Sequence, residues 1–151
     1  MVDAPTFKQA LGRFLSGVTV VSAEHDGTRR GMTVSAFSSV SLNPPLILVC
    51  LDKRAATLPL VRDAGRFGVS VLGAGQEALS NHFAGWGEAT VEWETLGQSP
   101  VLAGAIARLD CSVHHVLDAG DHDIVIGMVQ AADAGDGAPL AWWSGKYRQV
   151  G

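Results

Sequence analysis

Short runs of β-branched and other apolar residues, separated by turn-forming residues, recur along the whole chain and limit its fold more than any other feature. Strand-like runs occupy residues 17–23, 46–51, 67–72, 106–116, 124–131 and 140–149. The pair Asp26-Gly27 favours a tight turn, so residues 18–34 are predicted to form a β-hairpin. Residues 46–51, LILVCL, are apolar throughout and predict a fully buried strand. Six or more strands favour a closed or partly closed barrel.

Only three short helices are expected beside these strands. The first should pack by one side, with Asp3 or Thr6 as its N-cap and Gly17 as its terminator. The other two are predicted at residues 57–64 and near residues 76–83. The apolar face of the first helix consists of Phe7, Ala10, Leu11, Phe14 and Leu15.

Length, charge and composition exclude several kinds of protein. A chain of 151 residues, 47% of them hydrophobic, is predicted to form one domain over residues 1–151, mainly β in an α+β fold. The formal charge of −4, from 11 basic and 15 acidic residues, provides no basic surface for nucleic acid or an anionic membrane. No apolar run reaches about 18 residues, and the start MVDAPTFKQALGRF favours an amphipathic helix over a targeting segment, so a cytoplasmic protein is expected. Cys50 and Cys111 lack zinc-site spacing, so buried thiols and no metal are expected.

One segment favours a different fold. Residues 68–78, GVSVLGAGQEA, combine an apolar strand, a Gly73-Ala-Gly75 turn and a helix, as in the dinucleotide-binding fingerprint. That motif requires a second buried parallel strand ending in an acidic residue about twenty residues later. Residues 88–94, EATVEWE, alternate polar and apolar residues and are expected to be solvent-facing or irregular. A small Rossmann-type protein therefore remains the weaker alternative to a strand-to-helix turn that needs glycine geometry.

The stretch GMTVSAFSSVSLNPP at residues 31–45 is too polar for an ordinary core strand. Its short side chains allow a ligand to approach the backbone closely, and its hydroxyl groups provide hydrogen-bond donors and acceptors. This combination fits a planar ring with heteroatoms at its rim, although an edge strand with a solvated face fits it as well. The hydroxyl residues are Thr33, Ser35, Ser38, Ser39 and Ser41.

A candidate phosphate site follows this stretch. The buried strand at 46–51 leads to Asp52-Lys53-Arg54 and then to the predicted helix that begins at Thr57. Two cations beside a helix amino terminus form a plausible phosphate site, and ordinary surface charges are the alternative. A ring site next to a phosphate site is what flavin mononucleotide (FMN) requires.

Several motifs follow one another between about Phe7 and Tyr147: GVTVV at 17–21, residues 31–51 throughout, FGVSVL at 67–72, Phe83-Ala84, and GDHDIVIG at 120–127. Taken together and in this order, they resemble the short-chain flavin reductases, the reductase components of two-component flavin-dependent monooxygenases. The resemblance implies a split β-barrel with a few flanking helices, usually a homodimer, that reduces FMN or FAD with NADH or NADPH. Reduced flavin would then diffuse to a separate oxygenase.

The resemblance also implies roles for individual residues. His122, in the Gly-Asp-His match, would lie near the nicotinamide and act in hydride transfer, while a histidine in a turn is the alternative. Lys53 with Thr57 would hold the ribityl phosphate, together with Cys50, Leu51 and Asp52, and Arg54 would compensate for serines that the family has where this chain has Ala55 and Ala56. Tyr147 would form a wall of the pocket. The isoalloxazine would be edged by Thr33, Val34, Ser35, Ala36, Ser39, Val40 and Ser41, and the nucleotide groove by Phe83, Ala84 and Gly85.

The chain departs from the family pattern beside the ring. The family commonly has Asn and then Ser where this chain has Ser35 and Ala36, so fewer side-chain donors are available and looser flavin binding is expected. A flavin-binding protein of the same barrel without turnover therefore remains a second hypothesis. In either case the flavin supplies the redox chemistry, and the protein supplies orientation and electrostatics.

Overall fold

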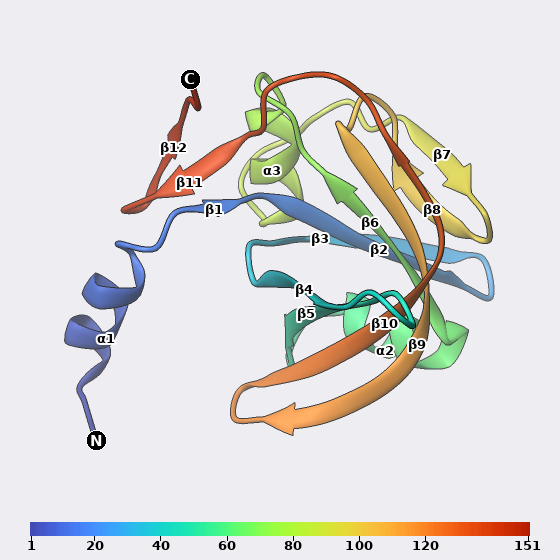
Figure 1. Cartoon of the computed structure of the whole chain (residues 1–151), viewed down its shortest axis with the longest axis horizontal. Coiled ribbons are helices and arrows are strands. Elements are labelled where there is room, and N and C mark those ends of the chain that lie inside the picture. Colours follow the sequence, from blue (N-terminus) through green and yellow to red (C-terminus); the bar gives the residue numbers. More distant parts are fainter.

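The computed structural model describes all residues, 1–151, and its main element is a seven-stranded antiparallel sheet (Figure 1). The edge strands β3 and β4 are consecutive in the chain, and only Ser35 and Ala36 separate them. The sheet therefore has to curl until its two edges meet, which produces the predicted partly closed barrel. In spatial order the strands are β3 (Thr28–Val34), β2 (Thr19–His25), β6 (Arg66–Val71), β9 (Ala107–Ala119), β10 (His122–Ala134), β5 (Leu46–Asp52) and β4 (Phe37–Ser41).

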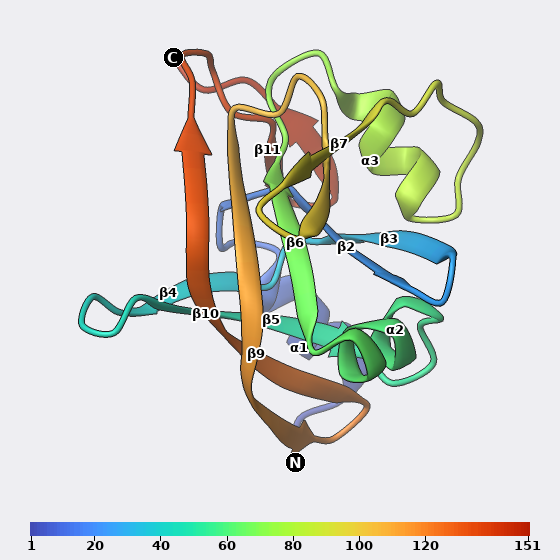
Figure 2. The ribbon, with the colours of Figure 1, turned by 90° about the vertical axis from the view of Figure 1, so that its right-hand side faces the viewer.

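The remaining elements lie outside this seven-stranded sheet. One small sheet contains β1 (Ser16–Gly17), β11 (Ala141–Trp143) and β12 (Lys146–Arg148), and the other contains β7 (Trp93–Leu96) and β8 (Ser99–Leu102). The helices are α1 (Ala4–Leu11), α2 (Thr57–Ala64) and α3 (Glu77–Phe83). Figure 2 shows α2 and α3 on the same side of the long β9–β10 pair. None of the helices has the length and apolar character needed to cross a lipid bilayer.

The predicted hairpin at residues 18–34 is confirmed by the antiparallel pairing of β2 with β3 around Asp26-Gly27. The prediction that residues 46–51 form a strand is also confirmed, but full burial is wrong. Along β5, Ile47, Val49 and Leu51 are buried and the residues between them are half-buried. A barrel strand has an inner face and an outer face, so an apolar run does not make both faces core.

Helix α1 differs most from the expectation. Asp3 is its N-cap, since the carboxylate accepts a hydrogen bond from the Thr6 N–H at 2.8 Å. The helix ends at Leu11 rather than at Gly17, and Gly12 follows as the C-cap. No residue of α1 is buried, so packing of its apolar side against the barrel is a wrong prediction for the single chain.

Helices α2 and α3 lie where the sequence predicts them. The alternative of a Rossmann-type fold around residues 68–78 is wrong. Strand β6, which precedes α3, pairs antiparallel with both β2 and β9, and β7 after α3 pairs only with β8. The turn between β6 and α3 requires glycine for local reasons. Gly75 has φ of +92°, and a Cβ on Gly73 would lie 2.8 Å from Ile106 Cγ2.

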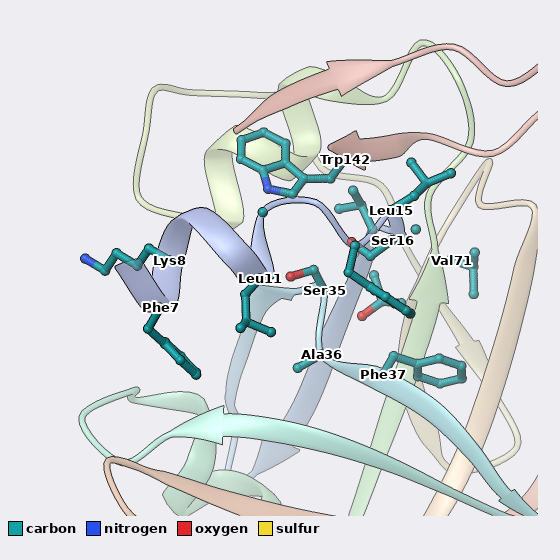
Figure 3. Close-up of a pocket in the computed structure, with 15 residues that line it drawn as sticks. Phe7, Lys8, Leu11, Leu15, Ser16, Ser35, Ala36, Phe37, Val71 and Trp142 are labelled. Carbon is teal, nitrogen blue, oxygen red and sulfur yellow. The ribbon is translucent and has the colours of Figure 1, made fainter. Parts of the chain in front are cut away.

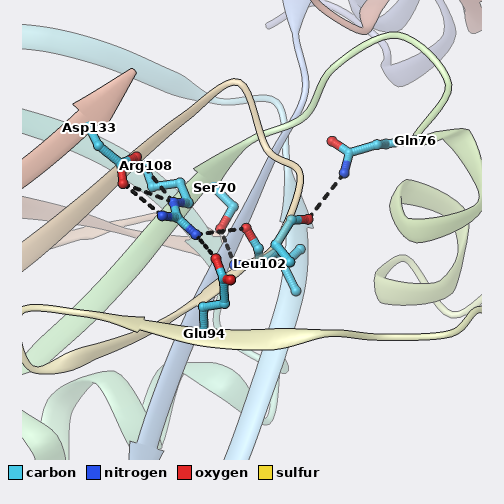
Figure 4. A network of polar contacts seen from close by, with 7 residues as sticks. Ser70, Gln76, Glu94, Leu102, Arg108 and Asp133 are labelled. Atoms are coloured by element: carbon cyan, nitrogen blue, oxygen red, sulfur yellow. Dashed lines mark hydrogen bonds and ion pairs between the residues drawn. The ribbon is translucent and has the colours of Figure 1, made fainter. Parts of the chain in front are cut away.

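The hairpin β7–β8 was not predicted, and polar contacts fasten it to the barrel (Figure 4). Arg108 on β9 forms ion pairs with Glu94 on β7 and with Asp133 on β10. The N–H of Leu102 on β8 donates to the Ser70 hydroxyl at 2.9 Å. Of residues 88–94, which were expected to be solvent-facing or irregular, 88–92 have no regular structure, whereas Trp93 and Glu94 begin β7.

Candidate functional site

Ser35 and Ala36, which connect β3 to β4, line a pocket and have main-chain groups without partners. The N–H groups of Ser35 and Ala36 donate to no acceptor within the chain, whereas the Ala36 carbonyl accepts the Cys50 N–H at 3.0 Å. Both residues are exposed. Unpaired main-chain donors next to small side chains are suited to binding the acceptor-rich edge of a flat ring. The pocket has a volume of about 230 Å³ and is lined by Met32, Thr33, Val34, Ser35, Ala36, Cys50, Asp52 and His122.

His122 reaches this pocket because β10 begins beside the end of β5. In the strand register, His122 lies opposite Asp52. Its Nδ1 lies 2.7 Å from a carboxylate oxygen of Asp121, and this contact lowers the pKa of Asp121. An imidazole held at Nδ1 in this way presents Nε2 to a ligand. The structure thus brings His122 together with Thr33, Ser35 and Ala36.

The cations predicted to bind phosphate are engaged with carboxylates. Lys53 pairs with Asp118 and donates to the Gly120 carbonyl at 2.6 Å, and the contact with Asp118 raises the pKa of Lys53. Hydrogen bonds from Arg54 lower the pKa of Asp52 to about 2, so this carboxylate in the pocket is ionised at neutral pH. Burial raises the pKa of the Cys50 thiol, which therefore stays neutral.

The start of α2 nevertheless provides unpaired donors next to these cations. The N–H groups of Ala56 and Thr57 have no acceptor within the chain, and no side chain caps the helix. Unpaired N–H groups at a helix amino terminus attract anions. Lys53 and Arg54 lie directly before this turn, and the Arg54 side chain is 90% exposed, so an anion at the surface would share these cations with Asp118 and Asp52.

A second pocket adjoins the first, because Thr33 and Ser35 line both. It has a volume of about 290 Å³. The Thr33 hydroxyl donates to the Ser80 carbonyl at 2.6 Å and so joins β3 to α3. The Tyr147 hydroxyl lies 2.7 Å from Ser80 Oγ and 2.6 Å from Asn81 Oδ1, which fixes the ring predicted to be a pocket wall. Ala84 also lines this pocket.

The remaining predicted site residues are buried or lie outside these two pockets. Val34, which borders the first pocket, and Leu51 have their side chains buried in the core, so mainly their backbone is available to a ligand. Thr57 is 2% exposed. Phe83 and Gly85 line a separate pocket of about 390 Å³ with Arg29 and Arg30. Ser39, Val40 and Ser41 lie on β4 and line neither of the two adjoining pockets.

Sequence reasoning missed a further cavity, a groove of about 680 Å³ beside α1 (Figure 3). Figure 3 shows α1 on one side of this groove, Trp142 above it, and Ala36 and Phe37 below it. Leu11 of α1, 54% exposed, and Phe14 just after the helix, 77% exposed, both line this groove. The amphipathic pattern of the first residues is the sequence signal for this groove, but such a pattern does not specify whether its apolar side packs internally or faces a groove.

Comparison with known proteins identifies the family. A family model described as a flavin reductase like domain matches residues 11–151. The chain belongs to the flavin reductase family. It is 45% identical over 145 residues to the reductase component of 4-hydroxyphenylacetate 3-monooxygenase from Thermus thermophilus, and the alignment covers 95% of each protein.

Solved structures agree with the membership of the flavin reductase family. A flavin reductase named PheA2 superposes with a TM-score of 0.96 at 39% identity, over 99% of both chains. The NADH:FAD oxidoreductase SgcE6 of Streptomyces globisporus, in complex with NAD and FAD fragments, superposes with a TM-score of 0.90 at 34% identity, over 100% of this chain and 96% of that one.

Proposed function

We propose that this protein is an NAD(P)H:flavin oxidoreductase that reduces FMN or FAD by hydride transfer and supplies the reduced flavin to a separate monooxygenase component. The observation that carries the proposal is the pair of unpaired N–H groups at Ser35 and Ala36, in a pocket that also contains His122. The family relatives, which are reductase components and NADH-dependent reductases, support the same activity.

The residues of the site fit a flavin nucleotide. The N–H groups of Ser35 and Ala36 offer donors to the carbonyl-rich edge of the ring, and the small side chains there leave room for close approach. The start of α2 and Lys53 offer donors to a phosphate. Since Ser35 and Ala36 provide few side-chain donors, we infer that flavin exchanges as a substrate rather than remaining tightly bound.

When bound, flavin supplies the chemistry that accepts a hydride from the nicotinamide. The chain itself binds and orients the two rings. Asp121 holds the His122 imidazole at Nδ1, so that Nε2 is the nitrogen that faces a ring in the pocket. The backbone donors of Ser35 and Ala36 stabilise negative charge that develops at the ring edge. Cys50 remains a neutral thiol because burial raises its pKa, and so adds no repulsive charge there.

We also infer a homodimer and a cytoplasmic location. The groove beside α1 is bordered by exposed Phe7, Leu11 and Phe14, and large apolar surfaces of this kind are normally covered by a partner. A second copy of the chain is the partner that the family resemblance implies. Cys50 and Cys111 are free thiols, which fits a reducing compartment.

The function is tested by mixing purified protein with NADH or NADPH and excess FMN or FAD, and following absorbance at the nicotinamide band. Loss of the reduced nicotinamide only when flavin is present is expected. No flavin-dependent loss with either donor would refute the reductase, and yellow protein without turnover would favour the flavin-binding hypothesis. His122→Ala is expected to slow turnover, and an unchanged rate would remove His122 from the mechanism.

A further inference from the structure

The first pocket contains a carboxylate that the proposed reaction does not yet use. Asp52, the last residue of β5, lines this pocket together with Ser35, Ala36 and His122. It is the only acidic residue in the lining. The family resemblance places Asp52 with the residues that hold a phosphate, but a carboxylate repels a phosphate. The charge of Asp52 therefore requires a different explanation.

The carboxylate of Asp52 is held in place and stays ionised. It accepts hydrogen bonds from the Arg54 guanidinium at 3.0 Å and from the Arg54 main-chain N–H at 2.8 Å, and these bonds lower the pKa of Asp52 to about 2. The Asp52 side chain is 28% exposed, whereas that of Arg54 is 90% exposed and lines neither of the two adjoining pockets. Water therefore screens the cation more than the carboxylate, and the pocket keeps a negative charge at neutral pH.

Hydride transfer separates charge between two rings. A hydride consists of one proton and two electrons, so its departure turns a neutral dihydronicotinamide ring into a cation. Its arrival gives a neutral flavin ring one negative charge. An active site lowers the barrier of such a step when its fixed charges and dipoles match the charges that develop. A site for this step is therefore expected to offer donors to one ring and negative charge to the other.

The first pocket offers both. The unpaired N–H groups of Ser35 and Ala36 suit the ring that becomes negative. A carboxylate opposes negative charge on that ring, so Asp52 suits the ring that becomes positive. In the strand register Asp52 lies opposite His122, the residue that the Gly-Asp-His match assigns to the nicotinamide side. The two ends of the pocket thus complement the two products of hydride transfer.

We propose that the Asp52 carboxylate stabilises the positive charge that develops on the nicotinamide ring as the hydride leaves it. The inference rests on the proposed function, since it takes this pocket to be the site of hydride transfer. The carboxylate accordingly binds the oxidised ring more tightly than the reduced ring, and it speeds the hydride step without tightening the binding of the neutral donor. Unit charges several ångströms apart near a protein surface change an equilibrium constant by about tenfold.

Binding is tested without turnover by calorimetric titration of protein saturated with FMN. The two ligands are NAD⁺, whose nicotinamide ring is positive, and tetrahydro-NAD, whose ring is neutral and cannot donate a hydride. Asp52→Asn is expected to weaken NAD⁺ binding about tenfold and to leave the binding of tetrahydro-NAD unchanged. Asp52→Glu, which keeps the charge, should retain the preference for NAD⁺. Unchanged NAD⁺ affinity in Asp52→Asn, or equal losses for both ligands, would overturn the proposal.

Anaerobic stopped-flow kinetics test the effect on the hydride step. The rate constant for reduction of FMN by NADH should fall about tenfold in Asp52→Asn, while the NADH concentration that gives half of the maximal rate stays constant. Deuterium at the transferred position of NADH should slow the variant at least as much as the wild type, because hydride transfer limits its rate. A higher half-saturating concentration with an unchanged maximal rate would assign Asp52 to ground-state binding and contradict the proposal.

The midpoint potential of bound FMN shows whether the carboxylate acts on the flavin instead. A carboxylate beside the flavin disfavours its reduced, negative form, so Asp52→Asn would then raise the potential. A tenfold change in the relative affinity for the two forms corresponds to about 30 mV for a two-electron couple. The expected shift is well below this value. A full shift of that size with unchanged NAD⁺ binding would overturn the proposal.

Asp133→Asn is the matched control. It also removes one negative charge from the seven-stranded sheet, but Asp133 lies at the opposite end of β10 from His122 and lines neither pocket. NAD⁺ affinity and the rate of FMN reduction should therefore match the wild type. A loss equal to that of Asp52→Asn would attribute the effect to net charge and overturn the role of the carboxylate in the pocket.

The two proposals fail separately. Wild-type protein without flavin-dependent NADH oxidation, in which Asp52→Asn still weakens NAD⁺ selectively, would refute the reductase and leave the recognition of the positive ring in place. Normal wild-type turnover, with NAD⁺ binding and the hydride step unchanged in Asp52→Asn, would refute the role of Asp52 alone.

Discussion

Asp110→Ala is expected to lower the free energy of unfolding strongly. It changes no residue that lines the two site pockets. Asp110 on β9 is 1% exposed. Its carboxylate accepts hydrogen bonds from Arg66 at 2.7 Å and from the Ser99 hydroxyl at 2.6 Å. A weaker bond of 3.3 Å comes from the Gln98 N–H. One buried carboxylate thus joins β9 to β6 and to the β7–β8 hairpin.

The magnitude follows from these contacts. Removing one partner of a buried ion pair costs about 3–5 kcal/mol. The Arg66 side chain keeps 25% of its surface in water and is partly rehydrated, which favours a loss of about 3 kcal/mol. The buried Ser99 hydroxyl also loses its acceptor, at about 1 kcal/mol. A total near 4 kcal/mol lowers Tm by about 8–16 °C in a domain of this size.

The assay compares calorimetric Tm and urea midpoints of Asp110→Ala with those of Asp133→Ala. Asp133 undergoes the same chemical change and pairs with Arg108 at 2.7 Å, but its side chain is 43% exposed. The Asp133 carboxylate is largely solvated, and Arg108, although its side chain is only 19% exposed, keeps Glu94 as a partner when Asp133 is removed, so the loss should be about 1 kcal/mol and Tm should fall by less than about 4 °C. Equal losses in the two variants would refute the argument from burial. Flavin-dependent turnover at 25 °C should persist in both.

Three further outcomes are expected. Burial raises the pKa of the Cys111 thiol from 9.0 to about 12. The unfolded chain therefore loses this proton at lower pH than the folded chain, and stability falls as the pH rises from about 9 to 12. Urea midpoints should fall less steeply over that interval in Cys111→Ala. Lys53→Ala should raise KM for FMN about tenfold and leave KM for riboflavin, which has no phosphate, unchanged; equal effects would separate Lys53 from the phosphate. Phe14→Glu places a charge in the exposed apolar groove and should shift the mass measured by sedimentation from dimer to monomer, whereas an unchanged mass would locate the interface elsewhere.

The local elements follow from local sequence signals. The turn at Asp26-Gly27, the limits of α2 and the cap at Asp3 each depend on residues within a few positions. The β7–β8 hairpin was missed because its stability comes from distant partners, Arg108 and Asp110, that no short window contains. The end of α1 was missed because an apolar pattern does not specify which surface will cover it.

In the site, too, some features follow from local sequence and others only from the tertiary structure. Thr33, Ser35 and Ala36 were found because a polar, small-residue run is unusual within a strand, and the structure places them on one cavity with Cys50, Asp52 and His122. Leu51 is fully buried, and Ser39, Val40 and Ser41 of β4 line neither of the two adjoining pockets. Neighbours in sequence therefore point to opposite faces of a strand or lie away from the site.

The sequence by itself determined a mainly β chain, the hydroxyl-rich stretch at residues 31–45 and the family to which they belong, because these depend on composition and on motifs in order. Only the tertiary structure decided that the two edge strands meet at Ser35 and Ala36 and leave their N–H groups unpaired. Closure also brought Trp86, from the far end of α3, beside Tyr147 near the carboxyl terminus. Such juxtapositions arise from the curling of the whole sheet, a property that no single segment encodes.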